Sequence, residues 1–156
     1  MSWFLKMSEE DYIYPEEEHD YDINWDYEPD EGADKEIMRL VSNYVKELHE
    51  KLLPQLKIFK TIRVEYVLLR PSQLAVYISG TKSAPVIGID IENTQIACEQ
   101  YGGECIKALK MSILHELGHA IQEALGKNLD EEEAEDFAYQ YYYFQTISDI
   151  INREEQ

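Results

Sequence analysis

A single apolar helix is the feature of this sequence that most constrains its fold. From about residue 104 to residue 125 the chain contains no proline, and apolar residues recur at helical spacing throughout. Apart from Glu116, no charged residue falls between Lys110 and Glu123. Gly126 follows the last periodic residue, where glycine commonly ends a helix. Because a helix this apolar is buried on most sides, two histidines and a glutamate inside it need a chemical reason.

These three polar residues are His115, Glu116 and His119, in the pattern His-Glu-x-x-His. Residues four apart on a helix lie on one face, with Cβ atoms about 5–6 Å apart, so both imidazoles can reach one metal ion. Zinc is the metal that such histidines commonly bind. Glu116 projects beside that ion, where it can accept a proton from a zinc-bound water. The sequence therefore predicts one zinc ion per chain; the alternative is a pair of hydrogen-bonded core histidines.

A catalytic zinc site needs a third protein ligand and leaves a fourth position open for water. After a short loop, residues 130–138 read Asp-Glu-Glu-Glu-Ala-Glu-Asp-Phe-Ala and offer several carboxylates. Asp130 suits the N-cap of a second helix, and acidic residues in a first turn complement the helix dipole. Helix capping and the helix dipole explain most of these carboxylates. One of them can still serve as the third ligand.

At this point the sequence resembles the gluzincin metallopeptidases, in which His-Glu-x-x-His is followed on the next helix by Glu-x-x-(Ala/Ser)-(Asp/Asn/Glu)-x-Phe-(Ala/Gly). Residues 131–138 fit that register. The resemblance covers roughly residues 85–143 and is strongest to small cytoplasmic gluzincins of bacteria and phages, such as the ImmA/IrrE group. It implies a zinc-dependent metallopeptidase in which Glu131 is the third ligand. It also implies that Glu135, one turn later, orients a ligand histidine.

The sequence departs from the gluzincin pattern in two places. The interval between His119 and Glu131 is shorter than in the larger thermolysin-like enzymes, so the two helices must form a tight hairpin. The position of Glu135 more often carries Asp or Asn. The third ligand therefore stays open among Glu131, Glu132 and Glu135. The metzincin pattern is excluded, because Gln122 and Leu125 occupy the positions of its glycine and third histidine.

The rest of the folded part reads as one helix followed by three strands. Apolar residues spaced three and four apart predict an amphipathic helix from Asp34 to about Leu53. Strands are predicted at residues 62–69, 74–79 and 86–91, and residues 93–103 are expected to form a loop or a short helical turn. The expected fold class is α+β, a minimal zincin-like domain with a small three-stranded sheet before the two ligand-bearing helices.

The expected reaction is hydrolysis of a peptide bond by a zinc-activated water, with Glu116 as general base. Gluzincins commonly add a Tyr or His that stabilises the oxyanion, and Tyr142 is the candidate on the third-ligand helix. By the same resemblance, the strand closest to the motif helix forms the edge of the cleft. The residues expected to pair with an extended protein or peptide substrate are Val86, Ile87, Gly88 and Ile89.

The N-terminal segment has a different composition. The first 34 residues carry 13 acidic residues against a single Lys6, and so supply −12 of the formal net charge of −18. We therefore expect two parts, an acidic, disordered tail at residues 1–33 and a zincin-like domain at residues 34–156. Seven aromatic residues in the tail favour a binding segment for a basic protein surface. Direct binding to nucleic acid is not expected, because phosphates would be repelled.

This tail supports an alternative function. The folded domain could be a catalytically silent zincin scaffold, with the tail acting as an interaction module that mimics nucleic acid. Against that alternative, both histidines, the general base and a registered third ligand are all present.

Cys98 and Cys105 have neither the spacing of a zinc knuckle nor that of a disulfide framework, and we expect them to be thiols in a reducing cytosol. The sequence shows no apolar run long enough for a signal peptide or a membrane span. The expected location is therefore cytoplasmic.

Overall fold

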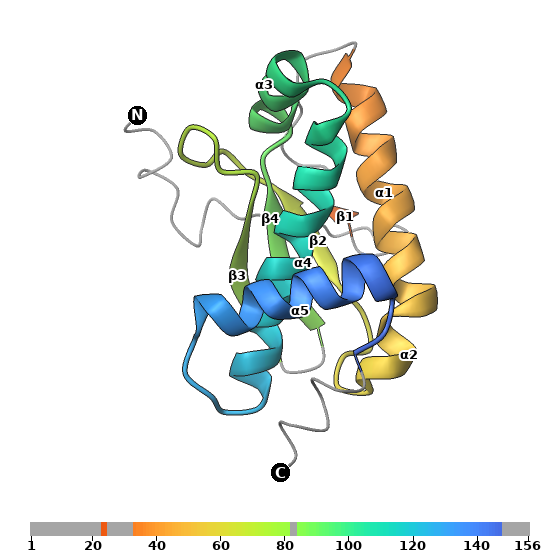
Figure 1. Ribbon diagram of the computed structural model, residues 1–156, viewed down its shortest axis with the longest axis vertical. Helices are drawn as coiled ribbons and strands as arrows, with labels where there is room; N and C mark the ends of the chain where they lie inside the picture. The colour runs from red at the N-terminus through yellow and green to blue at the C-terminus, as the bar shows by residue number, and fades with distance from the viewer. Residues whose placement is uncertain (1–22, 25–32, 82–83, 148–156) are drawn as a thin grey trace.

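The computed structural model describes residues 23–24, 33–81 and 84–147, which form an α+β fold (Figure 1). Four strands form one sheet: β1 (Ile23–Asn24), β2 (Arg63–Tyr66), β3 (Ala75–Thr81) and β4 (Ala84–Ile89). The helices are α1 (Ala33–Lys51), α2 (Leu53–Leu56), α3 (Ile91–Tyr101), α4 (Glu104–Ala124) and α5 (Glu131–Phe144). The predicted fold class is confirmed, and the sheet has one strand more than expected.

The strand order in the sheet is β1-β2-β4-β3. β1, β2 and β4 run parallel, whereas β3 forms an antiparallel pair with β4 that brings Tyr77 opposite Ile87. This order corrects the prediction that Val86, Ile87, Gly88 and Ile89 form an edge strand. Because β2 pairs with one side of β4 and β3 with the other, β4 is interior, and the edge next to the helices is β3.

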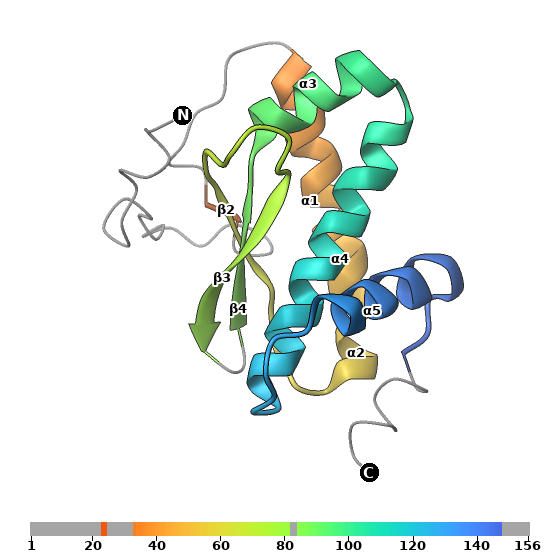
Figure 2. The same cartoon turned by 60° about the vertical axis from the view of Figure 1, so that its left-hand side comes forward.

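The described helices lie on one side of the sheet (Figure 2). α1 presents the predicted apolar stripe to the core, with Val41, Val45 and Leu48 fully buried. The middle of α4 lies against the sheet, where Ile113, Leu114 and Leu117 are fully buried. α5 crosses α4 on the side away from the sheet (Figure 1). α4 is therefore the central helix of the domain, which agrees with its apolar composition.

The turn between α4 and α5 forms for the reason expected from the sequence. Gly126 adopts a positive φ of 73°, and its N–H donates to the carbonyl of Glu123. The N–H of Lys127 donates to the carbonyl of Gln122, which completes a Schellman cap. Asp130 then caps α5 by accepting from the N–H of Glu133 at 3.1 Å. The two helices therefore form the tight hairpin that the short spacing required.

Residues 91–101 form a full helix, α3, where we expected a loop or a short helical turn. The helix begins after Asp90, which is its N-cap. The sequence pattern had predicted that Asp90 belongs to a strand. Asp90 Oδ1 accepts from the N–H of Asn93 at 2.8 Å, and its Oδ2 accepts from the N–H of Leu69 at 2.7 Å. Burial raises the pKa of Asp90, whereas these backbone hydrogen bonds lower it. The helix ends at Gly102, which has a positive φ of 63°.

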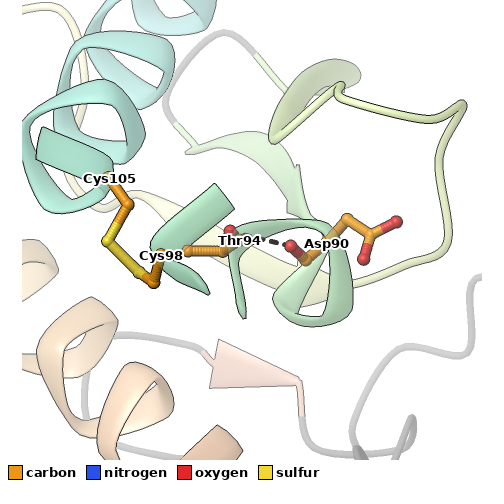
Figure 3. Close-up of a disulfide and its surroundings, with 4 residues drawn as sticks. All are labelled: Asp90, Thr94, Cys98 and Cys105. Atoms are coloured by element: carbon orange, nitrogen blue, oxygen red, sulfur yellow. Dashed lines mark hydrogen bonds between the residues drawn. A yellow bond between two sulfur atoms is a disulfide. The ribbon is translucent and has the colours of Figure 1, made fainter. Parts of the chain in front are cut away.

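Cys98 of α3 and Cys105 of α4 form a disulfide, which corrects the prediction of two free thiols (Figure 3). The missed helix is the physical reason. Once α3 and α4 are joined by the Gly102-Gly103 turn, the last turn of one helix and the first turn of the other lie side by side. The Cα atoms of the two cysteines are then 4.9 Å apart, a separation that a disulfide spans. The two cysteines therefore no longer indicate a reducing compartment.

The predicted tail, residues 1–33, lies mostly outside the described residues. The two residues Ile23 and Asn24 form β1, which pairs in parallel with Val64 and Glu65 of β2. The predicted disorder of residues 1–22 and 25–32, and their role as a binding segment, concern residues that the structure does not describe.

In the described part of the chain, no helix has the length and apolarity that crossing a membrane requires.

Candidate metal centre

A close contact between α4 and α5 brings the two halves of the candidate site together. Gly118, inside the motif, faces Ala134 of α5. A Cβ atom at position 118 would lie 2.9 Å from the Cα of Ala134 and 3.0 Å from its Cβ. Because only a glycine permits this approach, the first turn of α5 lies directly against the face of α4 that carries His115 and His119.

Glu131, the first residue of α5, contacts both histidines. Its Oε2 lies 2.8 Å from His115 Nε2, and its Oε1 lies 2.8 Å from His119 Nε2. The centroids of the two imidazole rings are 4.8 Å apart. His115, Glu116 and His119 form a group whose potential ligand atoms all lie within 4.8 Å of one another. The hydrogen bond from His115 holds the pKa of Glu131 below its ordinary value.

The three carboxylates that the sequence left open have different positions. Glu135 Oε2 lies 3.0 Å from His115 Nδ1, the ring nitrogen on the other side from Glu131. The side chain of Glu132 is exposed and has no hydrogen-bond or ion-pair partner among the described residues. Glu131 is therefore the carboxylate placed between the two Nε2 atoms, and Glu135 is placed to orient His115.

Gln122 determines which nitrogen of His119 carries the proton. The side-chain nitrogen of Gln122 donates to the Asp130 carbonyl at 2.9 Å and to Glu133 Oε1 at 3.0 Å. The side-chain oxygen of Gln122 must therefore accept, from the N–H of Asp130 at 3.1 Å and from His119 Nδ1 at 2.9 Å. A neutral His119 then has its proton on Nδ1 and presents the lone pair of Nε2 to Glu131.

In several of these histidine–glutamate contacts, two hydrogen-bond acceptors face each other. In a neutral His119, the lone pair of Nε2 faces a carboxylate oxygen. Both ring nitrogens of His115 face carboxylate oxygens, yet a neutral imidazole has only one N–H. Such pairs require either additional protons or a cation between the Nε2 atoms and Glu131. A divalent ion satisfies all of them at once, and two imidazoles with one carboxylate are a donor set that suits zinc.

Glu116 is held by the edge strand. Its Oε1 accepts from the backbone N–H of Tyr77 in β3 at 2.8 Å. Partial burial raises the pKa of Glu116, whereas the hydrogen bond from Tyr77 and the neighbouring histidines act in the opposite direction. A raised pKa brings a carboxylate closer to the range in which a general base works near neutral pH.

A cleft of about 270 Å³ opens beside Glu116. It is lined on the helix side by His115, Glu116 and Glu135, and on the strand side by residues 72–75. The first residue of β3, Ala75, thus borders the cleft, and β4 does not. The cleft gives a bound molecule access to the face of α4 on which the candidate metal ligands lie.

Tyr142, the candidate oxyanion stabiliser, does not line this cleft. Its ring packs edge-on against Tyr143, with centroids 5.1 Å apart, and it lies against the hydrophobic core. Among the described residues, the structure shows no contact between Tyr142 and the histidines or Glu131. The packing of this tyrosine is accounted for without a role in the site.

Two contacts of the site were not anticipated from the sequence. Gln122 entered the sequence analysis only as evidence against a metzincin. Its position three residues after His119 does place it within reach on the same helix face, so helical spacing could have indicated it. The N–H of Tyr77 carries no sequence signal, because every residue except proline has one.

We predict that Gln122→Leu weakens zinc binding by about 10- to 100-fold, because the side chain that fixes the tautomer of His119 is lost. Zinc affinity is measured by competition with a chelator of known affinity. Gln140→Leu on α5 is the matched control, since Gln140 has no side-chain hydrogen bond in the described structure. Equal affinities for the two variants would contradict the role assigned to Gln122.

No protein-family model matches this chain, and neither a curated protein nor a solved structure matches it. The likeness to gluzincins therefore rests on the motif residues.

Proposed function

We propose that this protein is a zinc-dependent metallopeptidase of the gluzincin type that hydrolyses peptide bonds in extended polypeptide segments. The observation that carries the proposal is the position of Glu131. Its two carboxylate oxygens each lie 2.8 Å from the Nε2 atom of one motif histidine. Glu116 and an open cleft adjoin this arrangement. Two histidines, a carboxylate and a neighbouring glutamate that is not a metal ligand are what hydrolytic zinc chemistry requires.

In this proposal His115, His119 and Glu131 hold the metal. Zinc, when bound, polarises the amide carbonyl as a Lewis acid and lowers the pKa of a bound water to about 7. Glu116 accepts a proton from the attacking water and delivers it to the leaving amine nitrogen. The N–H of Tyr77 keeps the Glu116 carboxylate oriented during both transfers. Glu135 and Gln122 hold the two imidazoles through their Nδ1 atoms.

The position of β3 supports a polypeptide as substrate. β3 is an edge strand of the sheet, and its first residue, Ala75, borders the cleft. An extended peptide can add to such an edge through main-chain hydrogen bonds. This mode of binding favours unfolded or extended segments over folded surfaces.

The zinc content of the purified protein tests the proposal. We expect close to one zinc ion per wild-type chain and a loss of zinc in both His115→Ala and Glu131→Ala. Glu132→Ala is the matched control and should keep its zinc, because Glu132 is exposed and lies one residue from the proposed ligand. The loaded wild type should also cleave fluorescein-labelled casein, lose this activity to a chelator and regain it with zinc.

A wild-type chain that takes up no zinc would overturn the proposal. So would zinc binding that is the same in His115→Ala as in the wild type. Loss of zinc from Glu132→Ala but not from Glu131→Ala would identify Glu132 as the third ligand in place of Glu131. The proposed class of enzyme would stay the same.

A further inference from the structure

A second, larger pocket adjoins the cleft. It has a volume of about 750 Å³ and lies between α3 and the first half of α4. Ile96, Ala97 and Tyr101 of α3 form one wall, and Ala108 and Met111 of α4 form the other. A volume of this size is typical of pockets that bind a ligand.

The pocket and the cleft are neighbours. Ser72, Leu74 and Met111 line both of them. Met111 precedes His115 by four residues, a rise of about 6 Å along a helix. Since an extended polypeptide rises about 3.3 Å per residue, a peptide bond held at His115 places side chains a few residues away at the pocket.

The end of the pocket nearest the sheet is held rigidly. Asn93, in the first turn of α3, donates from its side-chain nitrogen to the carbonyls of Arg70 at 2.7 Å and Gln73 at 2.9 Å. These bonds join α3 to the loop between β2 and β3, whose Pro71 and Ser72 line the pocket. Thr94 Oγ1 donates to the Asp90 carbonyl at 2.8 Å and secures the same turn of helix (Figure 3).

The disulfide holds the other end of the pocket. It joins Cys98 in the second half of α3 to Cys105 in the first turn of α4 (Figure 3). Cys105 itself lines the pocket. Both walls are thus fixed relative to each other before a ligand arrives. A preformed pocket binds more tightly than one that must be ordered on binding.

The walls also expose apolar surface. Ile96 is 50% exposed and Tyr101 is 68% exposed, although both are large hydrophobic residues. Exposed apolar residues gathered at a concave surface indicate a binding site for an apolar group. Met111 and Leu74 continue this surface toward the cleft.

We propose that the pocket between α3 and α4 binds a large apolar side chain, aliphatic or aromatic, of the polypeptide substrate. That side chain lies about two to four residues from the cleaved bond, as the rise per residue of helix α4 and of an extended peptide indicates. This inference rests on the proposed peptidase function and names its substrate class, which is polypeptide segments with an exposed large hydrophobic residue near the cleavage site. The residues that the pocket shares with the cleft favour the substrate as its occupant.

The first test is the set of sites that the zinc-loaded wild type cuts in casein, identified by mass spectrometry. We expect a large apolar residue two to four positions from each cut. Ile96→Asp should lower kcat/KM for a peptide with such a residue by about tenfold or more, since apolar pockets contribute about 1–3 kcal/mol to specificity. Phe144→Asp is the matched control. Phe144 is 63% exposed at the end of α5 and does not line the pocket, so this variant should cleave as the wild type does.

The second test measures binding without cleavage. In the Glu116→Gln protein, fluorescence anisotropy compares a fluorescein-labelled decapeptide containing one phenylalanine with the same peptide containing serine. We expect the phenylalanine peptide to bind about tenfold more tightly. The added substitution Ile96→Asp should remove this difference, and Phe144→Asp should preserve it.

The outcomes separate this inference from the function on which it rests. Cleavage without any apolar preference, or equal effects of Ile96→Asp and Phe144→Asp, overturns the pocket assignment and leaves the peptidase intact. Absence of zinc and of cleavage overturns the peptidase. In that case a binding preference for the phenylalanine peptide that depends on Ile96 still supports the pocket, and equal binding of the two peptides rejects it.

Discussion

Glu116→Gln is expected to bind zinc as tightly as the wild type and to cleave casein on the order of 10³-fold more slowly. The substituted amide has nearly the shape of the carboxylate, and its oxygen can still accept from the N–H of Tyr77. It cannot, however, take a proton from water at neutral pH. Because Glu116 is not among the three groups that we assign to the metal, the loss should appear in kcat with the zinc content unchanged.

Glu123→Gln is the control for this substitution. Glu123 lies on the same helix two turns later, and it accepts from the hydroxyl of Tyr77 at 2.9 Å, a hydrogen bond that glutamine can also make. This variant should retain activity within about a factor of two to three, the effect of a surface change of below 1 kcal/mol. Full activity in Glu116→Gln, or loss of its zinc, would show that Glu116 is not the general base.

Gly118→Ala is expected to destabilise the fold by about 1–3 kcal/mol and to weaken zinc binding together with it. Alanine favours a helix over glycine by about 1 kcal/mol, so helix propensity alone predicts the opposite sign. The added methyl group would lie 2.9 Å from the Cα of Ala134, and backbone cannot rotate away as a side chain can. α5 must therefore move, and Glu131 moves with it from between His115 and His119.

Gly103→Ala separates these two effects. Gly103 is at the N-cap of α4 with φ −61°, and a Cβ at this position meets no atom within 4 Å. Thermal unfolding and chelator competition on both variants measure stability and zinc affinity. We expect Gly103→Ala to match the wild type in zinc affinity. A stable Gly118→Ala protein with unchanged zinc affinity would refute the close α4–α5 contact as the basis of the site.

The sequence predicted well those features that depend on neighbouring residues. The spacing of apolar residues predicted α1 and α4, Gly126 predicted the end of α4, and Asp130 predicted the start of α5. Each of these features is determined within one or two turns of chain. The positions of Glu131 and Glu135 beside His115 were implied by the resemblance to gluzincins, because His115 lies on another helix, and both contacts are present.

The features that the sequence did not predict depend on distant residues. Strand order is set by which strands pair, and nothing in residues 86–89 indicates that β2 lies on their second side. The start of α3 depends on Asp90, whose Oδ2 is engaged by the N–H of Leu69, 21 residues away. Without α3 there was no reason to bring Cys98 to Cys105. Similarly, Tyr77 and Glu116 are 39 residues apart, and only the fold brings them together.

The hairpin of α4 and α5 also determines where bound metal acts on the stability of the chain. His115 and Glu131 are 16 residues apart, so a shared ion closes a short loop inside one hairpin. α5 packs mainly on α4, and its buried side chains are Ala134, Phe137, Ala138 and Tyr141. If the site holds zinc as proposed, the free energy of metal binding would therefore add mainly to the docking of α5 on α4, while α1 and the sheet keep their own stability. The supply of metal around the protein would then set how firmly this last helix is docked.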